Sequence, residues 1–223
     1  MRHGLTDANT GGTLAGWTPG VHLADKGRDQ VAALSARLAK IPLTAIVSSP
    51  LERCQETAQA LLGDREGLTI ETDDRLGECR YGDWQGQPLK TLAKDPLWKV
   101  VQAHPSAVTF PGGEALRDTQ ARAVDAVRHH NARLGPDATW VAVSHGDVIK
   151  AILADALGLH LDAFQRIVVD PASVSIVTYT DLRPFVVRTN DIGGDLAGLI
   201  PRPRKRRKRS SDAAVGGGAG GAG

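Results

Sequence analysis

The sequence predicts an α/β domain with a mostly parallel sheet covered by helices on both faces. Short apolar, β-branched runs typical of buried strands alternate with longer segments of helical periodicity along most of the chain. The length of 223 residues is enough for one domain with a sizeable core. The hydrophobic fraction of 41% and the charged fraction of 23% are those of a soluble globular protein.

The first half of the chain predicts two helices and two strands after an opening loop. The loop is rich in Gly, Thr and Asn, and apolar residues at near-helical spacing follow it, with Asp25 as a plausible cap. The strand that comes next is a short β-branched run ended by Pro50. The expected elements are a loop over 4–24, a helix from 25 to 41, a strand over 44–50, a helix over 51–62 and a strand over 68–73.

The second half continues the alternation after a stretch rich in loops. Short helices are expected within that stretch, and the last two β-branched runs are consistent with one antiparallel hairpin. The expected elements are helices near 87–93 and 95–103, a helix over 114–134, a strand over 139–146, a helix over 147–157, and strands over 173–180 and 184–189.

The last 23 residues differ in composition from the rest of the chain. Residues 201–223 hold seven of the 27 Lys and Arg residues and one of the 25 acidic residues, so the body before them carries a net charge of −4. Their Pro, basic and Gly/Ala content cannot bury apolar surface. We therefore expect a domain over residues 1–200 and a disordered tail, for which weak contact with nucleic acid is a possible but not the favoured role.

The sequence also indicates where the protein works. No apolar run approaches the roughly 20 residues that span a bilayer, and the N-terminus has no signal-peptide hydrophobic region. The two cysteines, Cys54 and Cys79, form no CxxC motif and are expected to be buried thiols. We expect a cytoplasmic protein with no membrane contact.

Reactive side chains follow the predicted strands at one edge of the sheet. His3 enters the first loop, Arg53 lies in the first turn after the strand over 44–50, and His145 stands where the strand over 139–146 ends. Glu78 lies in the loop after the strand over 68–73. Open α/β sheets bind ligands beyond the carboxyl ends of their strands, so these side chains are expected to converge.

This set of residues is suited to phosphoryl transfer. Arg2 and Arg53 offer planar forks of donors that match phosphate oxygens. A neutral imidazole can attack phosphorus, and a carboxylic acid with a raised pKa can protonate the leaving alkoxide. Tyr81 and Trp84 lie close to Glu78 in sequence and would supply the apolar setting that raises its pKa. This chemistry requires no metal, and no cofactor is implied.

Six segments resemble, in order, the sequence blocks of the histidine phosphatase superfamily, in its phosphoglycerate-mutase-like branch. The resemblance covers roughly residues 2–180 and implies an α/β/α sandwich. The segments are RHGLTDAN (2–9), GW (16–17), SSPLERCQET (48–57), LGECRYGDWQG (76–86), FPGGE (110–114) and VSHGDVIK (143–150). The resemblance implies these roles: His3 as nucleophile, Arg2, Arg53 and His145 as the phosphate pocket, Asn9 at its edge, and Glu78 as proton donor.

Three departures from the family pattern stand out. The family has an apolar strand before the RHG triplet, whereas only Met1 precedes Arg2 here, so the first strand looks truncated and the native start is expected upstream. Asp147, close after His145, is a possible alternative acid to Glu78, because another branch of the family uses an aspartate there. Ala24 stands where the family often has a Thr helix cap, and Asp25 is expected to substitute for it.

Three functions compete. We favour a metal-independent phosphatase that hydrolyses a small phosphomonoester of a phosphorylated metabolite through a phosphohistidine. A phosphoglycerate-type phosphomutase is the alternative, although the 66 residues between Glu78 and His145 leave little room for extra segments. A non-catalytic binding module with a basic tail is the further alternative. The substrate and the oligomeric state are not predicted.

Overall fold

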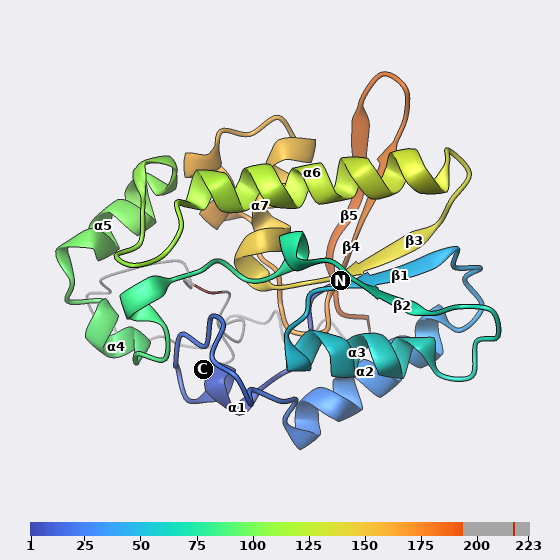
Figure 1. Ribbon diagram of the computed structural model, residues 1–223, viewed down its shortest axis with the longest axis horizontal. Helices are drawn as coiled ribbons and strands as arrows, with labels where there is room; N and C mark the ends of the chain where they lie inside the picture. The colour runs from blue at the N-terminus through green and yellow to red at the C-terminus, as the bar shows by residue number, and fades with distance from the viewer. Residues whose placement is uncertain (194–215, 217–223) are drawn as a thin grey trace, which may run out of the picture.

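The computed structural model describes residues 1–193 and residue 216. Its centre is a parallel sheet in which β1 (Ala45–Ser48) lies between β2 (Ile70–Thr72) and β3 (Trp140–Val143). The helices flank this sheet, as Figure 1 shows. The predicted α/β/α sandwich is confirmed. The expected tail lies outside the described residues, apart from Gly216.

The alternation of side chains along β1 assigns one face of the sheet to each helical layer. Ile46 packs in a cluster with residues of α2 (Asp25–Leu38) and α3 (Glu52–Leu62). Val47 points to the other face and packs with Ala126 of α6 (Leu116–Leu134). Successive side chains of a strand point to opposite faces, so this four-residue strand contributes to both cores.

Residues 1–3 occupy the position next to β3 where the family's first strand was expected. Ser144 N–H donates to Met1 O at 2.9 Å, and His3 N–H donates to Ser144 O at 3.1 Å. On the other side, Arg2 N–H donates to Ser173 O at 3.0 Å and Ala172 N–H donates to His3 O at 2.9 Å. This short segment is therefore hydrogen-bonded on both sides, which fixes the backbone of His3.

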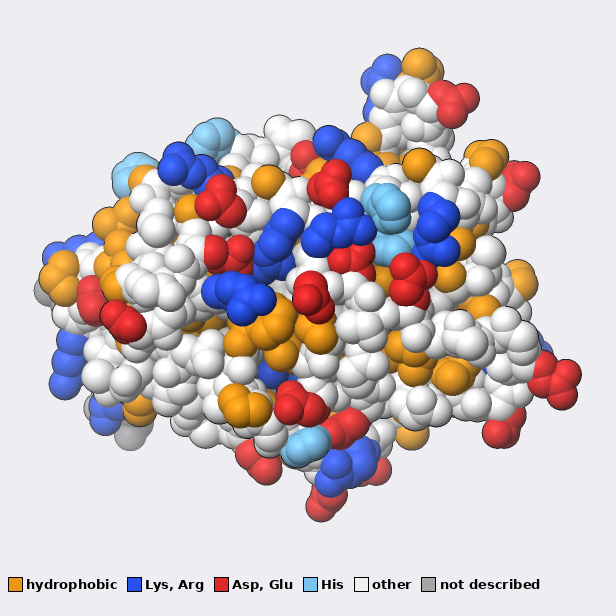
Figure 2. All heavy atoms as spheres, in the orientation of Figure 1, with side chains coloured by type: hydrophobic (Ala, Val, Ile, Leu, Met, Phe, Trp, Pro, Cys, Tyr) orange, Lys and Arg blue, Asp and Glu red, His pale blue; other side chains and the backbone are white. Residues whose placement is uncertain are grey.

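The chain after Ser173 forms the hairpin that the sequence predicted. β4 (Val174–Tyr179) pairs antiparallel with β5 (Pro184–Asp191). Val177 and Val186 of this hairpin pack against Ile149 of α7 (Gly146–Ala156). The hairpin thereby joins the main body through α7, while its tip projects from the molecule in Figures 1 and 2.

The segment between β2 and α6 is built from short helices around an aromatic core. Trp84 stacks on Trp98 with ring centroids 6.0 Å apart, and Phe110 packs edge-on against Tyr81. The helices are η1 (Asp74–Leu76), η2 (Gly82–Trp84), α4 (Leu89–Leu92), α5 (Pro96–Ala103) and η3 (Pro105–Ala107). The two helices predicted near 87–93 and 95–103 correspond to α4 and α5.

Two local expectations were wrong, and one element had no prediction. The opening loop contains a helix, α1 (Asp7–Thr10), whose N-cap is Thr6, and no element was predicted where η4 (Leu161–Arg166) lies. The N-cap of α2 is Ala24, which makes no side-chain cap bond. Asp25 is instead the first helical residue, one position past the N-cap from which a side chain accepts the free N–H groups. Its carboxylate binds Arg28 at 2.8 Å.

The outer face of α6 carries interspersed basic and acidic side chains (Figure 2). Arg75 binds Asp125 of this helix at 2.7 Å, and Arg122 binds Glu114 at 2.6 Å. The Arg75–Asp125 pair is exposed on its Asp125 side and adds little to stability, whereas Arg122 and Glu114 are partly buried. In the part of the chain that the structure describes, no helix is long and apolar enough to cross a membrane.

The close contact between the backbone of α2 and the loop after His3 can be tested by mutation. A Cβ atom at Gly27 would overlap the carbonyl oxygen of Leu5, and one at Gly4 would lie 2.7 Å from Gly27 O. Gly→Ala inside a helix ordinarily stabilises it, but Gly27→Ala should lower the free energy of unfolding by about 1–3 kcal/mol because of this overlap.

Chemical denaturation of Gly27→Ala measures the loss. Gly11→Ala is the milder control, since Gly11 has a φ of −75° and an added Cβ would lie 3.1 Å from Asp7 O, a tight contact but less severe than the 2.0 Å to Leu5 O at Gly27. Equal stability of the wild type and Gly27→Ala would show that α2 does not hold the loop in this way.

Candidate active site

Three of the sequence-predicted residues meet at the carboxyl ends of β1 and β3. His3 leaves the short segment beside β3, Arg53 lies in the first turn of α3 after β1, and His145 is the N-cap of α7 after β3. The rings of His3 and His145 have centroids 5.3 Å apart, and Arg53 Nη2 lies 3.2 Å from His145 Nδ1. The topology therefore brings two imidazoles and a guanidinium to one place.

His3 is held as a neutral imidazole. Its Nδ1 lies 2.7 Å from Gly4 O, which can only accept, so Nδ1 carries the proton and Nε2 keeps a lone pair. Burial lowers the pKa of His3 well below 6.5, and the positive charges of Arg53 and Arg2 lower it further. A lone pair on Nε2 at neutral pH is what a nucleophilic imidazole requires.

Two arginines are buried beside the imidazoles. Arg53 Nη2 donates to Gly16 O at 2.8 Å, while Arg53 Nη1 is buried with no hydrogen-bond partner among the described residues. Arg2 Nη1 donates to Val169 O at 2.7 Å. Burial lowers the pKa of Arg2 to about 10, so Arg2 remains a cation at neutral pH. These guanidinium groups make the site attractive to an anion.

His145 lies behind His3 and Arg53 and is fully buried. Its Nε2 is 2.7 Å from Ser49 Oγ. Burial lowers the pKa of His145 well below 6.5, with further lowering by Arg53 and His3. This imidazole is therefore also neutral at physiological pH.

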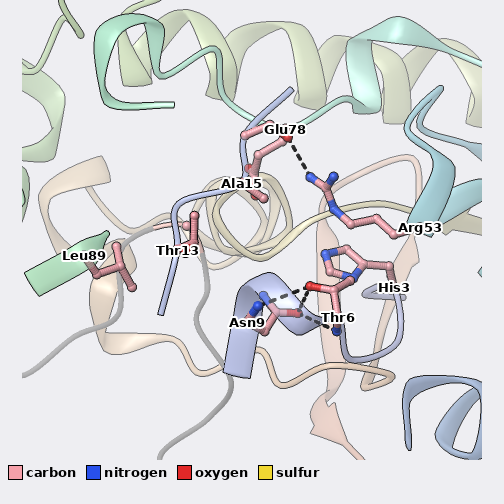
Figure 3. A pocket seen from close by; sticks show the side chains of 10 residues that line it. His3, Thr6, Asn9, Thr13, Ala15, Arg53, Glu78 and Leu89 are labelled. Carbon is pink, nitrogen blue, oxygen red and sulfur yellow. Dashed lines mark hydrogen bonds between the residues drawn. The ribbon is translucent and has the colours of Figure 1, made fainter. Parts of the chain in front are cut away.

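A pocket opens in front of His3 and Arg53 (Figure 3). The space inside it and in front of its mouth is about 360 Å³, a figure that includes open solvent. Most of the side chains that line it are polar, and Ala15 and Leu89 are the apolar ones. The lining residues are His3, Thr6, Asn9, Thr13, Ala15, Gly16, Arg53, Glu78, Leu89 and Gly216. Arg2 and His145 stand behind this lining rather than in it.

Asn9 is oriented by a neighbour that the sequence analysis missed. The backbone N–H of Thr6 and its hydroxyl both donate to Asn9 Oδ1, at 3.1 and 2.9 Å, as Figure 3 shows. The amide oxygen of Asn9 is thus occupied, which leaves its NH₂ group as the available donor. The spacing of Thr6 and Asn9 is that of a capping box, a signal that would have identified Thr6 from the sequence.

Glu78 contributes a buried carboxyl group to the same pocket. Its Oε1 accepts from Cys79 N–H at 3.0 Å, and its carbonyl oxygen accepts from Trp17 Nε1 at 2.6 Å and Arg122 Nη2 at 3.0 Å. Burial raises the pKa of Glu78 to about 7, and the negative charge of Asp147 adds to the rise. Such a carboxyl group is partly protonated at neutral pH.

Asp147 is buried but is already engaged by other groups. Its Oδ2 accepts from the Tyr81 hydroxyl and from Gly216 N–H, each at 2.9 Å. Its Oδ1 lies 3.6 Å from Lys150 Nζ. Tyr81 was expected to supply an apolar setting for Glu78, and it instead binds the carboxylate whose charge acts on Glu78.

The two cysteines are free and buried, as predicted. Within residues 1–193 and 216, no three His, Cys, Asp or Glu side chains are grouped so that they could hold a metal ion.

Comparison with known proteins gives the same family that the sequence blocks suggested. The profile of the histidine phosphatase superfamily (branch 1) matches residues 1–192. Glucosyl-3-phosphoglycerate phosphatase of Mycolicibacterium vanbaalenii is 36% identical over 169 residues, which cover 73% of this chain and 74% of that protein. The protein of the same name from Mycobacterium tuberculosis is 35% identical over 167 residues, 71% of this chain and 74% of its own length.

Superposition on solved structures supports the same family assignment. YhfR of Bacillus stearothermophilus superimposes with a TM-score of 0.80 at 30% identity, covering 86% of this chain and 95% of that one. A mycobacterial glucosyl-3-phosphoglycerate phosphatase in complex with VO3 superimposes with a TM-score of 0.76 at 31% identity, covering 85% and 96%. From its sequence blocks, its sheet and these relatives together, this chain belongs to the histidine phosphatase superfamily and is an enzyme of the histidine phosphatase type.

Proposed function

We propose that this enzyme hydrolyses a small phosphomonoester through a phosphohistidine on His3, with Glu78 as the proton donor and no metal ion. One observation carries the proposal. The Nε2 lone pair of a neutral His3 and the buried carboxyl group of Glu78 line the same pocket, together with the guanidinium of Arg53. A nucleophile, an acid and a cation are the three groups that phosphoryl transfer requires.

In the first step, His3 Nε2 attacks phosphorus and the bond to the ester oxygen breaks. The proton of the Glu78 carboxyl group passes to the departing oxygen, so an alcohol leaves and Glu78 becomes a carboxylate. Arg53 and Arg2 supply positive charge to the phosphoryl oxygens, and the Asn9 NH₂ group offers a hydrogen bond. The covalent product is a phosphoramidate on His3.

In the second step, the Glu78 carboxylate takes a proton from water as its oxygen attacks phosphorus. The bond between phosphorus and Nε2 breaks, and its electron pair returns to the imidazole. Inorganic phosphate leaves, and both His3 and Glu78 regain their starting protonation states. His145 stays neutral throughout and contributes to the phosphate pocket through Arg53.

The position of Glu78 supports its assignment as the acid over Asp147. Glu78 lines the pocket, whereas Asp147 is held by Tyr81 and Lys150 behind it. The negative charge of Asp147 also raises the pKa of Glu78, which keeps a proton available on Glu78 at neutral pH. Asp147 therefore supports the donor rather than replacing it.

The relatives favour a phosphatase acting on a phosphoglycerate ester. Those at 35–36% identity carry the name glucosyl-3-phosphoglycerate phosphatase, and a protein named 2,3-bisphosphoglycerate-dependent phosphoglycerate mutase 2 from Gloeobacter violaceus is 29% identical over 178 residues. The hydroxyl and amide groups of Thr6, Thr13 and Asn9 at the pocket wall suit a substrate rich in oxygen. We therefore propose small phosphorylated metabolites of this class as substrates.

Replacement of the nucleophile tests the proposal directly. His3→Ala should lower the rate of phosphate release from p-nitrophenyl phosphate at least about a thousandfold, because the covalent step is lost. The assay is run in EDTA, so that retained wild-type activity also tests independence from metal ions. An acid-labile phosphorylated protein should be trapped by rapid quenching of the wild type alone.

His129→Ala is the matched control, since His129 is exposed on α6 and is expected to keep full activity. Equal rates for the wild type and His3→Ala would disprove the phosphohistidine.

The pH dependence tests the acid. Glu78 must be protonated to donate, so activity toward alkyl phosphates should fall as pH rises through about 7, the pKa of this carboxyl group. Asp147→Asn removes a like charge and lowers that pKa, so the alkaline limb of kcat/KM should move to lower pH. Glu78→Gln should abolish the limb and lower kcat about 10²–10⁴-fold for alkyl phosphates.

The same Glu78→Gln variant should lose much less activity toward p-nitrophenyl phosphate, whose leaving group does not need the proton. Asp181→Asn, at an exposed position in the turn of the hairpin, serves as the charge control. An unchanged alkaline limb in both Glu78→Gln and Asp147→Asn would exclude Glu78 as the acid.

A substrate panel separates a phosphatase from a mutase. Glucosyl-3-phosphoglycerate, 3-phosphoglycerate and phosphoserine should each be scored for phosphate release and for isomerisation, with and without 2,3-bisphosphoglycerate. We expect phosphate release without the bisphosphate, with a higher kcat/KM for one of these esters than for p-nitrophenyl phosphate. Isomerisation of 3-phosphoglycerate that depends on the bisphosphate would instead establish a mutase.

A further inference from the structure

A buried serine next to His145 takes no part in the steps above. Ser49 is the first residue after β1, and its side chain has no exposed surface. Its N–H donates to Val143 O at 2.9 Å, and its carbonyl oxygen accepts from Gln55 Nε2 at 2.6 Å. The backbone of Ser49 is therefore tied to the end of β3, the strand that leads into His145.

The contacts of His145 determine which ring nitrogen carries the proton. A guanidinium group can only donate, so the contact from Arg53 Nη2 at 3.2 Å requires a lone pair on His145 Nδ1. A neutral imidazole has one proton, which must then be on Nε2. Ser49 Oγ lies 2.7 Å from Nε2 and accepts that proton's hydrogen bond.

Among the residues that the structure describes, no other group in contact with this N–H matches Ser49 as an acceptor. Cys54 Sγ lies 3.4 Å from His145 Nε2, but a thiol sulfur is a weak acceptor. Burial raises the pKa of the Cys54 thiol to about 12, so it stays uncharged and gains no strength as an acceptor. Without the Ser49 hydroxyl, a proton on Nε2 would be buried with poor compensation.

The tautomer of His145 matters because it holds Arg53. Nη2 of Arg53 is shared between Gly16 O and His145 Nδ1, and Nη1 is left as a buried donor at the wall of the pocket. If the proton moved to Nδ1, an N–H would face the guanidinium, and Nη2 would lose one of its two acceptors. The fork of Arg53 would then no longer be fixed toward the pocket.

We propose that Ser49 is a positioning residue that fixes the proton of His145 on Nε2 and thereby orients Arg53 toward the phosphoryl group. The proposal rests on the phosphatase function proposed above, and it extends that function by one residue outside the pocket. Ser49 touches neither the substrate nor the reacting atoms; it acts through His145.

Adjacent Ser48 provides a matched control. Ser48 is equally buried, and its hydroxyl donates to Ser49 O at 2.9 Å rather than to a catalytic group. Ser48→Ala and Ser49→Ala each remove one buried hydroxyl from the same two-residue segment. Ser49 Oγ also accepts from Leu51 N–H at 3.3 Å, so Ser48→Ala reports the loss of a buried hydroxyl, and the ¹⁵N spectra of His145 separate the tautomer from this second contact.

The experiment combines spectroscopy, inhibition and kinetics. The ¹⁵N resonances of His145, assigned with His145→Gln, should show a protonated Nε2 in the wild type and in Ser48→Ala, and a change of tautomer or exchange between tautomers in Ser49→Ala. The inhibition constant of orthovanadate should rise, and kcat/KM should fall, by about tenfold in Ser49→Ala alone, as expected for one lost hydrogen bond. Ser49→Thr keeps the hydroxyl and should recover most of both.

Each outcome decides the proposal. The same tautomer and vanadate affinity in Ser49→Ala as in Ser48→Ala would overturn it, even with an active wild type and an inactive His3→Ala. Equal inactivity of the wild type and His3→Ala would instead refute the phosphatase function, while the spectra would still report on Ser49. If Ser49→Ala does not fold, Ser49→Cys gives the same test, because sulfur is the weaker acceptor.

Discussion

The site depends on the burial of guanidinium groups beside two imidazoles. Arg2 and Arg53 are almost fully buried, and they stay cationic because arginine resists deprotonation. Burial lowers the pKa of both histidines, and the positive charges of the arginines lower it further, so both histidines are neutral. A neutral His3 has the lone pair that the proposed nucleophile needs, and a neutral His145 has one lone pair to offer Arg53. In the proposed mechanism, the same charges that attract a phosphate ester thus also prepare the groups that react with it.

The carboxyl groups oppose this positive charge and set the balance of the site. Burial and Asp147 raise the pKa of Glu78, while Arg53 and Arg2 lower it, and the result lies near neutral pH. Asp147 in turn is stabilised by the Tyr81 hydroxyl and lies within 3.6 Å of Lys150. Two interacting carboxyl groups need not share a role. Glu78 lines the pocket, and the negative charge of Asp147 raises the pKa of Glu78.

Sequence patterns located the strands and the side chains that follow them, because both depend on local information. Arg53 and His145 could be placed at one edge of the sheet from the rule that ligands bind beyond the carboxyl ends of parallel strands. The sequence left Asp147 as a rival to Glu78, because the contacts of Asp147 with Tyr81 and Lys150, which support our proposal of Glu78, form only in the folded chain. Asp25 was expected to substitute for Ala24 as the cap of α2, whereas Ala24 itself is the N-cap and its N–H donates to Leu5 O, a contact across the opening loop. Tertiary contact of this kind overrides the local preference for a polar cap.

The ring of His3, the proposed nucleophile, is held by a hydrogen bond to the backbone rather than to a neighbouring side chain. His3 Nδ1 donates to the carbonyl of the next residue, so its tautomer depends on the conformation of Gly4. Gly4 N–H donates to Thr57 Oγ1 of α3 at 3.2 Å, and Gly4 also lies against Gly27 of α2. Both helices on one face of the sheet thus determine which nitrogen of His3 keeps its lone pair. The close packing of two glycines, which leaves no space for a side chain, is therefore part of the chemistry of the site as well as of the fold.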